Sequence, residues 1–82
     1  MLKVVFFASL REELATRELE LSLNGPLTVA ELKQQLALTS PVWLRQLGQR
    51  QILQAVNQQL VGLDHALQQG DEVAFFPMVT GG

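Results

Sequence analysis

The chain closes with FFPMVTGG, Phe75 to Gly82, and the chemistry that this ending allows is that of its terminal carboxylate. Pro77 cannot donate to a β-ladder, and a glycine has no side chain, so the last residues form a thin end that can enter a narrow site on another protein. An inert, frayed terminus is the alternative, because most chain ends are of that kind. The surrounding sequence has to decide between the two.

The other side chains that could react have no suitable neighbours in the sequence. His65 is the only histidine, and its predicted place in a turn favours local hydrogen bonding over a metal or acid–base role. The chain has no cysteine, and therefore no thiolate nucleophile. Ser9 and Ser40 are better explained as a helix cap and a turn residue, and Thr80 has no base nearby in the sequence. We therefore predict no metal site and no stand-alone catalytic site.

Length and composition predict a single domain, residues 1–82, with residues 77–82 as a flexible C-terminal tail. The 82 residues are 48% hydrophobic and 17% charged, which is typical of a folded chain with one core. A net charge of -2 offers no basic field for nucleic acid or anionic lipid, so we expect neither as a partner. The apolar N-terminal run is too short for a secretion signal, and the absence of cysteine fits a reducing, cytoplasmic location.

Alternating and β-branched residues predict five strands. Residues 2–8 form an apolar strand in which Lys3 marks the face without a covering layer. Residues 18–23 alternate leucine with polar residues, as in a half-exposed antiparallel strand. The remaining predicted strands are residues 52–57 and 59–62, joined by a turn at Asn57-Gln58, and residues 72–76.

Two capping boxes predict two helices. Ser9 with Glu12 predicts a short helix over residues 10–15, and Thr28 with Glu31 predicts the main helix. The main helix covers residues 29–38, with Lys33 mostly outside.

Ser40-Pro41 stops the main helix, because the residue before a proline disfavours the helical region. Residues 42–50 are ambiguous and allow one helical turn that ends at Gly48. Trp43 is most simply a residue at the edge of the core.

This order of elements predicts an α+β fold, a mixed sheet with one main helix on one face and a bare opposite face. The first and last strands are both strongly apolar, so we expect them to be central neighbours.

Each of these two strands carries two consecutive phenylalanines, and alternation must split each pair across the sheet. Because Lys3 shares a face with Phe7, and Glu72 shares a face with Phe76, we predict Phe6 and Phe75 in the core. Phe7 and Phe76 then form a candidate protein interface on the bare face. The alternative is that residues 42–50 fold over them.

Three stretches carry a resemblance to a known family: FFASLRE near the start, AVNQQLV in the middle and GDEVAFFPMVTGG at the end. Together they make the chain similar, over essentially its whole length, to the small, sulfur-carrier subunits of molybdopterin synthase. The resemblance implies the ubiquitin-like β-grasp fold, in agreement with the predicted order of elements. Many members have a second proline where this chain has Met78.

The resemblance also implies a function for the terminus. The Gly82 carboxylate would be adenylated by an ATP-using enzyme, converted to a thiocarboxylate with the help of a sulfur-donating protein, and used to build the molybdopterin dithiolene from cyclic pyranopterin monophosphate. The chain would be a non-catalytic subunit with no permanently bound cofactor. Its partner would be the large synthase subunit, in a heterotetramer of two small and two large subunits.

Site residues follow from the same resemblance. Gly82 would be modified and Gly81 would permit threading, while Pro77, Met78, Val79 and Thr80 would lie along the partner's channel. Phe7, Arg11, Leu60 and Phe76 would face the partner, although Arg11 is equally explained as a solvated helix residue.

Three other functions remain open. They are a sulfur carrier for thiamine thiazole synthesis, a ubiquitin-like protein modifier, and a plain binding domain with an inert end.

Overall fold

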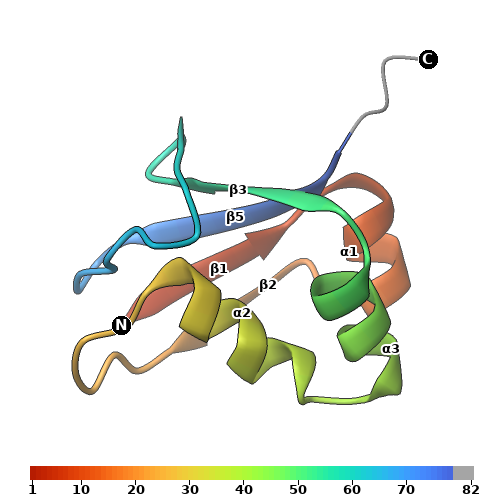
Figure 1. Ribbon diagram of the computed structural model, residues 1–82, viewed down its shortest axis with the longest axis horizontal. Helices are drawn as coiled ribbons and strands as arrows, with labels where there is room; N and C mark the ends of the chain where they lie inside the picture. The colour runs from red at the N-terminus through yellow and green to blue at the C-terminus, as the bar shows by residue number, and fades with distance from the viewer. Residues whose placement is uncertain (79–82) are drawn as a thin grey trace.

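The computed structural model describes residues 1–78, which form a five-stranded mixed sheet with its helices on one side (Figure 1). The predicted α+β arrangement is confirmed. The elements in chain order are β1 (Leu2–Phe6), α1 (Ala8–Leu14), β2 (Glu18–Leu21), α2 (Val29–Ala37), α3 (Pro41–Trp43), the π-helical segment η1 (Leu44–Gln49), β3 (Ile52–Val56), β4 (Gln59–Leu60) and β5 (Glu72–Pro77).

The sheet order is β2-β1-β5-β3-β4, so the first and last strands are central neighbours, as predicted. β1 and β5 are parallel, with Phe6 aligned with Phe75, and the other pairings are antiparallel. Central strands are those most fully flanked by other strands, which explains why these two are the most apolar in the sequence.

The core lies between the sheet and the helices. The Phe6 and Phe75 side chains are fully buried, and their rings stack with centroids 6.1 Å apart. Trp43 packs edge-on against Phe6 with the ring centroids 5.5 Å apart. Because Leu47 from η1 is also buried in this core, the segment 42–50 covers the helix side of the sheet. The alternative in which it folds over Phe7 and Phe76 is therefore wrong.

α2 has the predicted capping box. The Thr28 hydroxyl accepts a hydrogen bond from the Glu31 backbone N–H at 3.2 Å, and the Glu31 carboxylate accepts one from the Thr28 N–H at 2.9 Å. These contacts satisfy backbone donors that the first helical turn leaves unpaired. α2 ends at Ala37, one residue before the predicted end.

Ser9 does not cap α1, and this prediction was wrong. β1 ends at Phe6, Phe7 takes the N-cap position without a side-chain hydrogen bond, and Ala8 turns the chain with a φ of 55°. Ser9 therefore already lies inside the helix. Its hydroxyl instead accepts a hydrogen bond from the Arg50 guanidinium at 2.7 Å, which ties α1 to the end of η1.

Four strands are shorter than predicted: β1 ends at residue 6, β2 at residue 21, β3 at residue 56 and β4 at residue 60. Just beyond β4, the Val61 carbonyl accepts from the Gln54 side chain at 2.7 Å. The turn at Asn57-Gln58 is confirmed, with φ values of 51° and 71°.

The ambiguous segment after α2 is helical over most of its length. Ser40 caps the short helix α3, since its hydroxyl accepts from the Trp43 N–H at 3.3 Å, and Pro41 occupies the first turn. Ser40-Pro41 thus begins a helix as well as stopping one.

Candidate interaction site on the bare sheet face

The face of the sheet opposite α2, called the bare face below, is graded from charged to apolar. At the start of the two central strands the register aligns Lys3 with Glu72, and two residues later it aligns Val5 with Ala74. The same alternation brings Phe7 and Phe76 to this face at the strand ends. The grading follows the strand direction, so the apolar end is the end at which β5 leaves the sheet.

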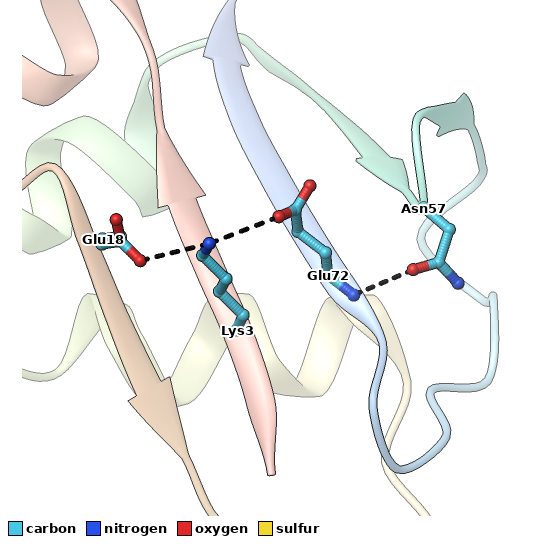
Figure 2. Close-up of polar contacts among 4 residues, drawn as sticks. All are labelled: Lys3, Glu18, Asn57 and Glu72. Carbon is cyan, nitrogen blue, oxygen red and sulfur yellow. Dashed lines mark hydrogen bonds and ion pairs between the residues drawn. The ribbon is translucent and has the colours of Figure 1, made fainter.

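The charged end of the bare face contains two ion pairs that share Lys3 (Figure 2). The Lys3 ammonium lies 3.4 Å from a Glu18 carboxylate oxygen on β2 and 3.7 Å from a Glu72 carboxylate oxygen on β5. The Asn57 side-chain oxygen accepts from the Glu72 backbone N–H at 3.0 Å. These side chains are about half exposed, and such ion pairs contribute roughly 0–1 kcal/mol each. The group therefore defines a polar border more than it stabilises the fold.

Phe7 and Phe76 form the apolar end. Phe7 is 47% exposed, and its backbone N–H donates to the Phe75 carbonyl at 3.1 Å, which keeps Phe7 alongside β5. Phe76 is partly buried and is paired with Leu53 on β3. The predicted division of the four phenylalanines between the two faces is confirmed. Sequence alternation was sufficient to find it because one helix layer covers one face only.

Leu60 extends the apolar surface to the sheet edge. It lies on β4 opposite Ala55, which in turn is opposite Ala74 on β5, so the three share one row across the bare face. Leu60 is 70% exposed. A leucine this exposed at the edge of a row of small apolar residues is suited to contact with another protein.

Arg11 and Phe7 border the same shallow hollow of about 220 Å³, and Arg17 is a third member of its wall. The Arg17 carbonyl accepts from the Phe6 N–H at 2.9 Å, which fixes Arg17 beside the end of β1. Sequence reasoning did not single out Arg17. Its nearness to Phe7 depends on the β1–β2 register, for which the sequence alone held no signal.

The chain leaves the sheet at Pro77 and Met78. Pro77 is the last residue of β5 and pairs with Ile52, and the Met78 N–H donates to the Gln51 carbonyl at 3.4 Å. Met78 is exposed. The predicted site residues Val79, Thr80, Gly81 and Gly82 lie outside the described residues.

The other features considered from the sequence are His65, a metal site and a membrane span. The His65 carbonyl accepts from the Val29 N–H at 3.0 Å, so this residue supports the start of α2 through its backbone. Residues 1–78 contain no group of three or more His, Cys, Asp or Glu side chains placed to hold a metal ion. Over the same residues, no helix has the length and apolar character to cross a membrane.

Comparisons with known proteins agree on the class of protein. A sequence profile described as the ThiS family matches residues 4–82. The chain is 50% identical to the molybdopterin synthase sulfur carrier subunit of Escherichia coli (strain K12), with 100% of both chains covered. It is 39% identical to the subunit of the same name from Haemophilus influenzae, again with 100% of both covered.

Among solved structures, small archaeal modifier protein 1 of Haloferax volcanii superposes with a TM-score of 0.79 at 26% identity, covering 95% of this chain and 97% of that one. Neighbours of this kind confirm the predicted ubiquitin-like β-grasp fold.

Proposed function

This chain belongs to the ThiS family, and we infer that it is the sulfur carrier subunit of a molybdopterin synthase. The observation that carries the inference is the 50% identity, over the full length of both chains, to a relative of that name. This identity also favours molybdopterin synthesis over thiamine thiazole synthesis, the other sulfur-carrier role considered from the sequence.

The reacting group in this proposal is the Gly82 carboxylate. A carboxylate is a poor electrophile, and its reaction with ATP to an acyl-adenylate supplies AMP as a good leaving group. A sulfur nucleophile can then attack the carbonyl carbon and leave a thiocarboxylate on Gly82. ATP is a substrate of the activating enzyme in this scheme, and the chain itself keeps no cofactor.

In this proposal the bare face binds the partner protein, and this binding places the tail in the partner's channel. Ordering a chain segment in a partner's channel costs roughly 1–2 kcal/mol per residue in backbone entropy. Full burial of an exposed phenylalanine or leucine returns roughly 1.5–3 kcal/mol. Because Phe7 and Phe76 are already partly buried, they and Leu60 return only part of this amount and offset part of the ordering cost. Hydrogen bonds to the tail and neutralisation of its carboxylate supply the rest. A narrow channel can provide both because Gly81 and Gly82 have no side chains.

Arg11 and Arg17 add an electrostatic element to the same surface. The hollow beside Phe7 is also lined by Glu18 and Glu72, but both of these carboxylates pair with Lys3. The two arginines therefore fit a partner that presents carboxylates around an apolar pocket. Charge pairs at the rim of an interface act mainly on the association rate and its salt dependence.

We propose the large subunit of molybdopterin synthase as this partner, in a complex of two small and two large subunits. In this proposal the catalytic groups belong to the large subunit. The small subunit would contribute its activated terminus as a reactant.

Reconstitution tests this function. The thiocarboxylated chain is mixed with the large subunit and cyclic pyranopterin monophosphate, and the product is assayed as molybdopterin. We expect one molybdopterin for every two thiocarboxylates consumed, because the dithiolene contains two sulfur atoms and each chain delivers one. If the chain fails in this assay but donates sulfur in a thiazole-forming assay, its function is in thiamine synthesis instead.

A protein modifier is the second candidate, because the fold is shared with a protein named a modifier. Intact mass of the chain from its native cell separates the two. Replacement of one terminal oxygen by sulfur supports the carrier, whereas isopeptide adducts on other proteins support the modifier.

A further inference from the structure

The chain contains two asparagines, Asn24 and Asn57, and their surroundings differ. Both are exposed, Asn24 in the loop between β2 and α2 and Asn57 in the turn between β3 and β4. Asn24 is followed by Gly25, whereas Asn57 is followed by Gln58. An asparagine side chain can react with the backbone nitrogen of the next residue, and a glycine at that position obstructs the approach least because it has no side chain. The two asparagines therefore form a comparison within one molecule.

The Asn57 side chain is restrained at both ends of its amide. Its nitrogen donates to an Asp71 carboxylate oxygen at 2.9 Å, and its oxygen accepts from the Glu72 backbone N–H at 3.0 Å. The Asn57 backbone N–H donates to the Glu72 carbonyl at 2.8 Å. These contacts hold the amide in one position and limit its freedom to rotate toward the Gln58 nitrogen.

The Asn24-Gly25 pair has no such restraint. Within residues 1–78, neither the Asn24 side chain nor the Gly25 N–H has a hydrogen-bond partner. Asn24, Gly25 and Pro26 are all exposed, and a Cβ placed on Gly25 would meet no atom within 4 Å. Both reacting groups, the side-chain amide and the following backbone nitrogen, are thus accessible and free to approach each other.

We propose that Asn24 is a spontaneous modification site, at which the side-chain amide is converted to a carboxylate without an enzyme. The Gly25 nitrogen loses its proton to base and bonds to the Asn24 Cγ carbon. The bond from Cγ to the side-chain nitrogen breaks, ammonia leaves, and a succinimide ring remains. Water then opens the ring at either carbonyl carbon, which gives an aspartate or an isoaspartate. The sum is the uptake of water and the release of ammonia, with no oxidation or reduction.

The modification adds a negative charge to the loop between β2 and α2 and leaves the flanks of that loop fixed. The Leu23 carbonyl accepts from the Gln69 side chain at 2.8 Å, and the Leu27 carbonyl accepts from the Leu67 N–H at 2.8 Å. This loop lies at the end of the molecule that holds the N-terminus, whereas β5 leaves the sheet at the opposite end (Figure 1). The fold and the bare face should therefore be unaffected. The inference goes beyond the sulfur-carrier function and does not depend on it.

Ageing of the purified full-length chain in mildly alkaline buffer tests the proposal, with Gly25→Ala as the matched control. Gly25 is not among the glycines with positive φ and has space for a Cβ, so this variant retains the fold. The variant keeps Asn24 but places a methyl group next to the attacking nitrogen. Samples are digested at acidic pH, which stops the reaction, and the peptides that contain Asn24 and Asn57 are followed by mass. Isoaspartate is measured separately, by methylation with an L-isoaspartyl methyltransferase and a labelled methyl donor.

We expect Asn24 to be converted at least about tenfold faster than Asn57, and Gly25→Ala to slow the conversion of Asn24 about tenfold. Isoaspartate should be among the products, and the rate should increase with pH because the Gly25 nitrogen attacks after losing its proton. Urea unfolding of the aged and the fresh chain should give the same free energy.

Three results would overturn the proposal. The first is conversion of Asn24 no faster than that of Asn57, and the second is an equal rate in the wild-type chain and in Gly25→Ala. The third is an aged product that contains aspartate but no isoaspartate, since direct hydrolysis by water would then replace attack by Gly25.

Discussion

The two faces of the central sheet are made from the same two strands and have opposite properties. On the helix side, Phe6 and Phe75 are fully buried and their rings stack in the core. On the bare face, their sequence neighbours Phe7 and Phe76 stand at the point where the chain leaves the sheet, and Phe7 is half exposed. Residues of one type, adjacent in the chain, thus serve stability on one face and remain available for binding on the other.

This difference shows how a small domain can present aromatic residues without losing its core. A period of two separates neighbouring side chains completely, so the bare face can change while the buried face stays intact. The charged group at Lys3 limits the apolar surface to one end of the bare face. The candidate interaction surface therefore lies at the end of the sheet where β5 finishes, next to Met78.

Deletion of Gly82 is the change with the largest expected effect. It removes the proposed reacting carboxylate and leaves both faces untouched, so sulfur transfer should fall to background while the free energy of unfolding stays the same. Molybdopterin formation and urea unfolding measure the two quantities. Transfer by the shortened chain would contradict the role of the terminus.

Alanine replacements of adjacent phenylalanines compare the faces directly. Phe6→Ala leaves a cavity in the core and should lower the free energy of unfolding by about 3–5 kcal/mol. Phe7→Ala should lower it by about 1 kcal/mol or less, since the Phe7 side chain is already half in water. Urea unfolding measures both, and equal losses would show that the two faces do not differ as described.

A charge on the bare face should act on binding more than on stability. Phe76→Glu is expected to weaken binding of the large subunit about tenfold or more, because an interface aromatic is replaced by a group that is costly to desolvate. Leu38→Glu, on the helix side, is the control and should bind normally in calorimetric titration. Collapse of the fold in Phe76→Glu would place Phe76 in the core and reverse the assignment of the faces.

Lys3→Ala should have the smallest effect. The Lys3 ion pairs are about half exposed, so their removal should change the free energy of unfolding by roughly 0–1 kcal/mol. The difference should shrink as salt is added, because salt screens exposed charges. A larger effect that persists in high salt would mean that Lys3 stabilises the sheet by packing.

Most of the fold could be predicted because its signals are local. Alternation found the strands, the pattern of Thr28 and Glu31 found the start of α2, and Ser40-Pro41 placed its end within one residue. The same kind of pattern failed at Ser9, where a capping-box motif is present but the backbone at Ala8 had already begun the helix. A side chain that matches a capping pattern is then free for another contact, here with Arg50.

The candidate site likewise has a part that the sequence predicted and a part that it did not. By itself, the sequence determined which phenylalanines face away from the core, where the chain ends in glycines, and which family it resembles. These depend on residue type and spacing along the chain, which a reader of the sequence has in full.

Only the tertiary structure decided that Arg17 lies beside Phe7, that Leu60 shares a row with Ala74, and that Lys33 lies in an apolar groove. Each of these depends on strand register or helix packing between segments far apart in the chain. Such contacts result from the packing of the whole core, and no single stretch of sequence contains them.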